Sequence, residues 1–161
     1  MKGHTPIKDE TYETIHRLMP IVCVDVVIMV EDKVLLIKRD KEPAKDQYWF
    51  PGGRLLKNES IKDAASRIVK SETNLNIFNI LHLGFDETVF AEDPFGHGEG
   101  THTVNHVYGA RIKSMDLIAL ALDEHHTEYL LHELNDVFYN DKMDSYVKKF
   151  TILAEAAYRR R

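Results

Sequence analysis

The stretch that decides the fold reads PGGRLLKNESIKDAASRIVKSETNL and runs from Pro51 to Leu75. It opens with a turn that contains two adjacent glycines and Arg54, and a helical pattern carrying Arg67 and Glu72 follows. Adjacent glycines let the backbone approach a ligand closely, and a main-chain carbonyl beside a carboxylate offers the oxygen ligands that magnesium prefers. The stretch therefore predicts a site that holds a metal against a diphosphate.

The helix after the glycine turn has a predictable start and end. Ser60 is a good N-cap, and Asp63 three residues later gives a start that resembles a capping box. Glu72 lies one turn beyond the apolar stripe, so its carboxylate points toward the core, where it is costly unless it meets a cation. Asn74 follows, where a left-handed residue ends the helix. A surface acid is the alternative for Glu72, and the glycine turn favours a metal ligand. The apolar stripe consists of Ile61, Ala64, Ala65, Ile68 and Val69.

Composition limits the class of protein. The 161 residues fit one domain, residues 1–161, and a hydrophobic content of 43% with 29% charged residues is ordinary for a soluble globular protein. The net charge of -5 argues against a nucleic-acid-binding surface. The single cysteine, Cys23, indicates a reducing compartment, and the apolar run at 21–30 is about half a membrane span. We therefore expect a cytoplasmic protein with neither a nucleic-acid nor a membrane partner.

The rest of the chain predicts a mixture of strands and helices in which strands outnumber helices. Glu31 and Asp32 separate two β-branched runs, which is typical of a hairpin. The expected elements are a helix at about 8–19, strands at 21–30, 33–38, 48–50, about 79–90 and about 102–112, the loop and helix at about 52–75, and a C-terminal helix at about 142–158.

The spacing within the decisive stretch resembles a known family motif. Gly53, Glu59, Arg67, Glu72 and Leu75 are similar to the Nudix box, Gly-x5-Glu-x7-Arg-Glu-U-x-Glu-Glu-x-Gly-U, in which U is aliphatic. The resemblance implies an α+β fold, the Nudix-type α/β/α sandwich with a mixed central β-sheet. It also implies a homodimer, for which the amphipathic N-terminal helix is a candidate contact.

Three positions depart from the box. Ile68 and Ser71 replace two of its glutamates, and Asn74 replaces its glycine. Ordinary Nudix pyrophosphatases use several of those glutamates to bind metals and activate water, so Glu72 is the remaining metal ligand of this set. One Nudix branch, the GDP-mannose mannosyl hydrolases, shares this loss.

The chain resembles that branch over about residues 18 to 135. The similar positions are Asp25, Lys38-Arg39, the stretch from Tyr48 to Arg54, and Asp123-Glu124-His125-His126. The resemblance implies hydrolysis of the glycosidic C–O bond of a nucleotide sugar, with release of a nucleoside diphosphate and free sugar. Such a reaction needs a cation for the departing diphosphate and a base for the attacking water.

Residues for both tasks are present in the sequence. Arg39 and Arg54 are expected to bind the substrate and stabilise the leaving group, because arginine offers planar donor pairs and stays charged. Arg67 matches the box arginine, which is expected to take part in catalysis or to orient Glu59 or Glu72. The alternative for Arg39 and Arg54 is that they are solvated arginines at a strand end and in a loop.

The general base and metal ligands follow from the resemblance. His126 matches the branch's loop histidine and is the expected base, since imidazole titrates near working pH. The implied metal ligands are Gly52, Glu72 and His125, with His125 in place of the branch's glutamine. Magnesium is the expected cofactor, and the imidazole makes manganese a candidate as well. A flexible acidic loop with two exposed histidines is the alternative.

Two further features bear on the substrate. Asp25 interrupts an apolar strand and needs a partner, either Arg39 across the hairpin or a substrate hydroxyl. Thr88 stands where the branch has a histidine, so the contacts to the sugar are expected to differ. The loop at 95–98 is a candidate for closing over a ligand.

Three functions remain open from the sequence. The first is the metal-dependent nucleotide-sugar hydrolase, and the second is a Nudix pyrophosphatase acting on a nucleoside diphosphate or triphosphate derivative. The third is a Nudix domain that senses a nucleotide sugar without turnover. The products distinguish the first two, and the absence of turnover alongside binding identifies the third.

Overall fold

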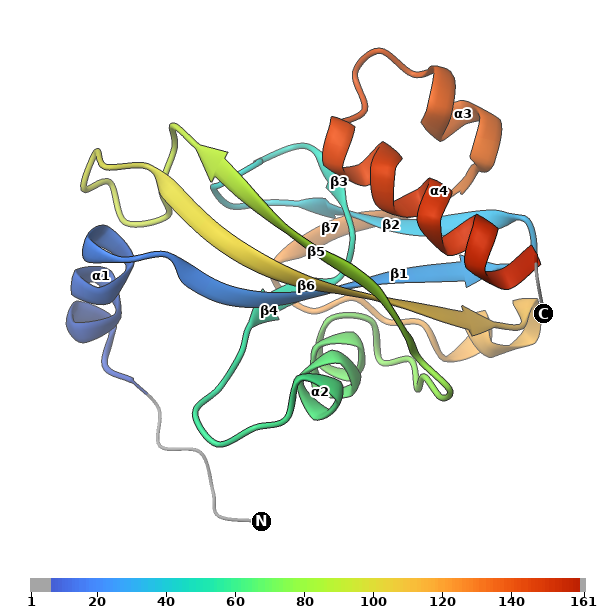
Figure 1. The fold of residues 1–161 in the computed structure, drawn as a ribbon, viewed down its shortest axis with the longest axis horizontal. Coiled ribbons are helices and arrows are strands. Elements are labelled where there is room, and N and C mark those ends of the chain that lie inside the picture. Colours follow the sequence, from blue (N-terminus) through green and yellow to red (C-terminus); the bar gives the residue numbers. More distant parts are fainter. Residues whose placement is uncertain (1–6, 160–161) are drawn as a thin grey trace.

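A mixed sheet lies at the centre of the fold (Figure 1), and in residues 7–159, which the computed structural model describes, it has seven strands. Its order is β3-β2-β1-β6-β5, with β4 paired to β1 and β7 paired to β2. The expected domain boundaries at residues 1 and 161 lie outside the described residues. The strands are β1 (Ile21–Val30), β2 (Lys33–Arg39), β3 (Tyr48–Trp49), β4 (Gly52–Arg54), β5 (Leu81–Phe90), β6 (Thr101–Ile112) and β7 (His126–Glu133).

The strand β1 is the axis of the sheet. It pairs antiparallel with β2, which confirms the predicted hairpin, and it pairs parallel with β6 along its whole length. Residues 24–30 of β1 are all buried, as expected of a strand covered on both faces. Because β1 is central, its single carboxylate, Asp25, is carried into the interior.

Helices cover both faces of the sheet (Figure 1). On one face, α2 (Ile61–Thr73) packs Ala64 and Ile68 against the side of β1 that carries Val26. On the other face, α4 (Ser145–Arg159) packs Val147 and Phe150 against the opposite side of β1 and β2. This arrangement confirms the predicted α/β/α sandwich with a mixed sheet. Among the described helices, none combines the length and apolar character that a membrane crossing needs.

The ends of α2 form as the sequence predicts. The Ser60 hydroxyl accepts the Asp63 N–H at 3.1 Å, and Asn74 adopts a left-handed conformation with φ of 58°. The N-terminal helix α1 (Asp9–Leu18) matches the predicted range to within one residue at each end. Local capping chemistry therefore fixes α2, which carries the most informative residues of the chain.

The C-terminal third differs from the prediction. The last helix begins at Ser145 and not near 142, because the Asp144 carboxylate accepts the Tyr146 N–H at 2.7 Å and caps it there. Three elements between residues 113 and 140 lack the clear periodicity that would have predicted them. They are the 3-10 helix η1 (Ser114–Ala119), the strand β7 and the helix α3 (Leu134–Tyr139).

Candidate functional site

The glycine turn lies between two carboxylates. Gly52 is paired with Asp25 of β1, and a Cβ atom added at Gly52 would clash with Oδ1 of Asp25. On its other side, the Gly52 N–H donates to Oε2 of Glu72 at 3.1 Å. Only glycine allows the backbone to approach both carboxylates this closely. The structure thus brings β1, β4 and the last turn of α2 together at Gly52.

Glu72 is a largely buried carboxylate, and no arginine or lysine among residues 7–159 forms an ion pair with it. Its side chain is 14% exposed, and its Oε2 lies 3.9 Å from Nε2 of His126. Burial raises the pKa of Glu72 to about 8, although the hydrogen bond from Gly52 opposes this effect. A buried acid of this kind is suited to bind a cation that compensates its charge.

His126 lies beside Glu72 and is held by Asp123. It is the first residue of β7, and its side chain is 8% exposed. Its Nδ1 lies 2.6 Å from Oδ1 of Asp123, and the Asp123 N–H donates to the main-chain carbonyl of Glu72 at 3.2 Å. No role was predicted for Asp123 from the sequence. Its position three residues before His126 was the available signal.

His125 occupies a different environment from His126. Its ring is exposed, and Nδ1 lies 3.0 Å from Nζ of Lys41. Its main-chain N–H donates to the Asp123 carboxylate at 3.0 Å. The structure therefore does not bring the His125 ring to Glu72, so the predicted metal ligands Gly52 and Glu72 meet without it.

Arg67 organises the loop before α2. Its Nε and Nη2 donate to the two oxygens of Glu59 at 2.6 and 2.9 Å, and Nη2 also donates to the Arg54 carbonyl at 3.1 Å. Glu59 in turn accepts the Leu56 N–H at 3.1 Å. Of the two orienting roles considered for Arg67, the contacts place it on Glu59.

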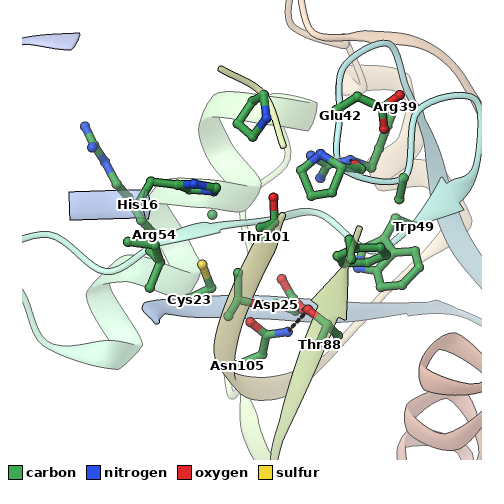
Figure 2. A pocket seen from close by; sticks show the side chains of 18 of the residues that line it. His16, Cys23, Asp25, Arg39, Glu42, Trp49, Arg54, Thr88, Thr101 and Asn105 are labelled. Atoms are coloured by element: carbon green, nitrogen blue, oxygen red, sulfur yellow. Dashed lines mark hydrogen bonds between the residues drawn. The ribbon is translucent and has the colours of Figure 1, made fainter. Parts of the chain in front are cut away.

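A cavity of about 200 Å³ opens beside the glycine turn (Figure 2). Figure 2 shows Arg39 and Arg54 on opposite sides of it, with Asp25, Thr88 and Asn105 near its floor. Glu72 and His126 are not among the residues that line the cavity. Gly52 lines the cavity and also contacts Glu72, so it connects the cavity to the pair formed by Glu72 and His126. Further lining residues are Tyr12, His16, Cys23, Trp49, Thr101 and Thr103.

The two arginines of the cavity are held differently. The guanidinium of Arg54 lies 4.1 Å from the ring centre of Tyr12 in α1, and Nη1 is buried without a hydrogen-bond partner in the described part of the chain. Arg39 donates from Nε to the Pro43 carbonyl at 2.8 Å. A buried, unpaired donor is uncommon in folded proteins, and an anionic group bound close to Arg54 would satisfy this one.

Asp25 has a partner that the sequence did not predict. Its Oδ2 accepts the Tyr146 hydroxyl of α4 at 2.6 Å, so Tyr146, and not Arg39, is its hydrogen-bond partner. Burial raises the pKa of Asp25 to about 6, opposed by that hydrogen bond and by the charge of Arg39. Tyr146 lies 121 positions away along the chain, too far for sequence periodicity to connect the two.

The cavity floor also carries uncharged polar groups. Asn105 of β6 is 3% exposed, and its Nδ2 donates to Oγ1 of Thr88 at 3.4 Å. Oγ1 of Thr88 lies 2.6 Å from Oγ1 of Thr103. Oδ1 of Asn105 is buried and has no hydrogen-bond partner within residues 7–159. Asn105 was not predicted from the sequence, where its only signal was a polar residue at a buried position of a strand.

The loop predicted as a lid has an ordered structure. The Asp93 carboxylate accepts main-chain N–H groups from each residue of the segment 95–98. Nε2 of His97 lies 2.9 Å from Nδ1 of His16, so the loop contacts α1 at the edge of the cavity. Closure over a ligand stays a prediction.

The oxygen donors near the glycine turn suit a metal ion that is bound by the protein and the substrate together. They do not suit a metal ion that is bound by protein side chains alone. Among residues 7–159, no three His, Cys, Asp or Glu side chains are grouped to hold one ion. Magnesium, however, is commonly held by one or two carboxylates together with substrate phosphates and water. The buried Glu72 carboxylate and the Gly52 carbonyl match that requirement, with Asp123 nearby.

A protein-family model and known proteins both match most of the chain. A family model described as the NUDIX domain matches residues 19–152. The low-salt glycan biosynthesis protein Agl8 of Haloferax volcanii is 31% identical over 132 residues, which are 82% of this chain and 83% of that protein. An ADP-ribose pyrophosphatase of Methanocaldococcus jannaschii is 34% identical over 99 residues, which are 62% of this chain and 58% of that protein.

The same fold occurs in solved structures. A NUDIX hydrolase from Nitrosomonas europaea superposes with a TM-score of 0.69, at 23% identity. The superposition covers 86% of this chain and 90% of that one. At this identity the likeness supports the fold alone.

Proposed function

Because the chain belongs to the Nudix family and is a Nudix hydrolase, we propose that it hydrolyses a nucleotide sugar with the help of a divalent metal. The bond that we propose to break is the glycosidic C–O bond, and the products are a nucleoside diphosphate and free sugar. Nudix hydrolases generally use magnesium or manganese and act on nucleotide derivatives.

The loss of two box glutamates from the α2 helix is the observation that carries this proposal. Ile68, which stands in place of a box glutamate, is 1% exposed and belongs to the hydrophobic core. Ser71, which replaces a second glutamate, donates its hydroxyl to the Ile68 carbonyl at 3.0 Å. Glu72 is the acid of this set that reaches the glycine turn. This helix therefore lacks the carboxylates with which a pyrophosphatase binds several metals and activates water at phosphorus.

The positive charges of the cavity suit a leaving diphosphate. Arg39 and Arg54 stand on opposite sides of it, and a guanidinium group offers paired N–H donors to phosphate oxygens. Glu72 and the Gly52 carbonyl would hold the metal, which when bound supplies further positive charge to the diphosphate. These groups stabilise negative charge as the glycosidic bond breaks, which is where a hydrolase of this type needs it.

His126 is the proposed base for the attacking water. Its Nδ1 is bound to Asp123, and its Nε2 faces Glu72 at the edge of the glycine turn. A neutral imidazole accepts a proton through the nitrogen that carries no hydrogen, and its ordinary pKa is near neutrality. His126 therefore can take the proton that water releases on attacking the sugar carbon.

The cavity floor supports a sugar as the group bound there. Asn105, Thr88 and Thr103 offer hydroxyl and amide groups, and Asp25 offers a carboxylate oxygen. Sugar hydroxyls both donate and accept hydrogen bonds, so they can satisfy this mixed set. The ring of Trp49 also lines the cavity and provides an apolar wall.

Cleavage between the phosphates is the second candidate. The relative from Methanocaldococcus jannaschii that carries the name ADP-ribose pyrophosphatase favours it, at 34% identity. Asp123 beside Glu72 would then have to supply the carboxylate that Ile68 and Ser71 cannot.

Product identification separates the candidates. The protein is incubated with GDP-mannose, UDP-glucose and ADP-ribose, each with magnesium or manganese, and the products are separated by chromatography. We expect a nucleoside diphosphate and free sugar from at least one nucleotide sugar. A nucleoside monophosphate with a sugar phosphate, or binding of all three without turnover, would contradict the proposal.

A further inference from the structure

The geometry points to a further role in this site: we infer that Asp123 is a positioning residue that keeps the hydrogen of the neutral His126 ring on Nδ1 and so frees Nε2 to accept a proton. This inference rests on the proposed function, in which His126 is the base. It assigns a task to Asp123, which lies outside the Nudix box and for which no role was predicted from the sequence.

The contact itself fixes the tautomer. Oδ1 of Asp123 lies 2.6 Å from Nδ1 of His126, a short hydrogen bond, and the two side chains are 24% and 8% exposed. An ionised carboxylate can only accept, so the hydrogen must be on Nδ1. A neutral imidazole has one ring N–H, and Nε2 is therefore bare. Free histidine in water prefers the opposite tautomer.

Asp123 is itself anchored, so it can direct the ring. Its N–H donates to the Glu72 carbonyl at 3.2 Å, and the Ala121 N–H donates to the Thr73 carbonyl at 3.0 Å. The side chain of Asn74 donates to the Ala119 carbonyl at 2.9 Å. These bonds attach the segment 119–123 to the end of α2. The carboxylate is thus held at a fixed place relative to the glycine turn.

Nε2 of His126, the ring nitrogen without a hydrogen, faces Glu72. Nε2 of His126 lies 3.9 Å from Oε2 of Glu72, which is beyond direct hydrogen-bond distance. Glu72 in turn accepts the Gly52 N–H, and Gly52 lines the cavity. Nε2 is therefore directed toward the turn that joins the metal-binding side to the cavity, and no direct hydrogen bond to Glu72 occupies it.

The proton transfer balances with these groups alone. The water oxygen bonds to the anomeric carbon, the bond from that carbon to the phosphate oxygen breaks, and its electron pair leaves with the diphosphate. One water proton moves to Nε2 of His126, and the other stays on the new sugar hydroxyl. The resulting imidazolium carries hydrogens on both nitrogens, and the Asp123 carboxylate stabilises its charge.

A direct metal ligand is the competing role for Asp123. The carboxylate stands near Glu72, but its Oδ1 already accepts from Nδ1 of His126 and from the His125 N–H. Two N–H donors on one oxygen favour the positioning role. Metal binding is therefore measured together with activity.

The tautomer of His126 provides a readout that needs no turnover. Protein labelled with 15N in histidine is studied by NMR at about pH 8, above the ordinary imidazole pKa. In the wild type we expect His126 to show a hydrogen-bearing Nδ1 and a bare Nε2, and in Asp123→Ala we expect the Nε2–H form. Wild-type tautomer populations in Asp123→Ala would overturn the inference.

The kinetic test uses three variants. We expect Asp123→Ala to lower kcat by about 10²-fold with KM nearly unchanged, and Asp123→Asn, which keeps an acceptor for the His125 N–H, to lower kcat as well. The matched control is Asp116→Asn. Asp116 caps η1, where its carboxylate accepts the Lys113 N–H at 2.9 Å, and it takes no part in this site. We expect its kcat to equal that of the wild type.

Metal titration separates the two roles of Asp123. The dissociation constant of Mn²⁺ alone, measured by electron paramagnetic resonance, should stay at the wild-type value in Asp123→Asn and rise in Glu72→Gln. An equal rise in both variants would make Asp123 a ligand and overturn the inference. If the wild type turns over no nucleotide sugar, the proposed function fails, whereas the NMR result still decides the role of Asp123.

Discussion

The N–H of Gly52 donates to the carboxylate of Glu72 at 3.1 Å, which joins the glycine turn to the last turn of α2. The same helix directs Ile68 into the core and ties the Ser71 hydroxyl to its own backbone. One acid of the helix therefore reaches the turn. This relationship is the basis of the proposal that the Nudix box binds a diphosphate while His126, on another strand, activates the water.

Removal of the proposed base should slow the chemical step without weakening nucleotide binding. We predict that His126→Ala lowers kcat by about 10²-fold or more, because the variant loses the group that we propose accepts the proton from water. The inhibition constant of GDP should change little, since the arginines and the glycine turn remain. His102→Ala is the control, as His102 lies on β6 and contacts Glu87 at 3.3 Å. A near-wild-type kcat in His126→Ala would remove His126 from the mechanism.

The close approach of Asp25 to the glycine turn predicts that alanine substitution lowers stability more at Gly52 than at Gly53. In Gly52→Ala the new Cβ would clash with Asp25, and we expect a loss of about 1–3 kcal/mol in the free energy of unfolding. In Gly53→Ala the nearest atoms are those of Ile68 at 3.6 Å, an ordinary contact, so a smaller loss is expected. Urea denaturation of both variants tests the difference, and equal losses would contradict it.

The loop at the cavity edge should lose stability in acid through Asp93. Burial raises the pKa of this carboxyl, but the N–H groups of residues 95–98 outweigh it and bring the pKa to about 2. Because the folded value lies below the ordinary value of 3.8, ionised Asp93 stabilises the fold fully above that value. Its contribution is lost as the pH falls toward about 2.

The variant Asp93→Asn isolates this effect. We predict that the difference in unfolding free energy between wild type and variant is constant above about pH 4 and shrinks as the pH falls toward 2. Denaturation curves between these values measure it. The exposed Asp32 in the turn between β1 and β2 gives the control substitution for loss of one charge. A difference that stays constant down to pH 2 would show that Asp93 does not act through its ionised form.

Asn105 should contribute to binding of the sugar and not of the diphosphate. Its buried Oδ1 lacks a partner in the described part of the chain, so a sugar hydroxyl that donates to it gains a hydrogen bond. We predict that Asn105→Ala raises KM for the nucleotide sugar about tenfold while the inhibition constant of GDP is unchanged. Thr151→Ala is the matched control, because its hydroxyl is also buried and has no partner among residues 7–159, but it lies in α4 outside the cavity lining. Equal KM values for both variants would refute this assignment.

Local patterns predicted the parts of the fold that depend on local chemistry. Ser60 and Asn74 fix the ends of α2, and the hairpin of β1 and β2 follows from two β-branched runs. The strand β7, in contrast, begins at His126 directly after an acidic segment and lacks clear alternation, so only its pairing with β2 defines it. His126 was accordingly predicted to lie in a loop, whereas it is the first residue of β7.

The site shows the same division. The glycine turn, Glu72 and the two arginines occupy positions that a motif can identify. The partner of Asp25 is Tyr146, 121 residues away, and the floor around Asn105 forms through pairing of β5 with β6. Such contacts depend on which elements pack together, and a single sequence does not record that. The likeness to the Nudix family supplied the fold, whereas the contact of Asp123 with His126 and the place of Asn105 in the cavity became visible only in three dimensions.

Hydrolysis in water enriched in 18O tests the central claim most directly, because it reports which atom the water attacks. A nucleotide sugar that the protein turns over, with GDP-mannose as the first choice, is hydrolysed in the labelled water, and the phosphorus-containing product is studied by mass spectrometry. Phosphate oxygens do not exchange with water under these conditions, whereas the anomeric oxygen of a free sugar does. We predict a nucleoside diphosphate that contains no 18O, as attack at carbon requires. A label in the nucleoside diphosphate, or in a nucleotide or sugar phosphate, would demonstrate attack at phosphorus and contradict the claim.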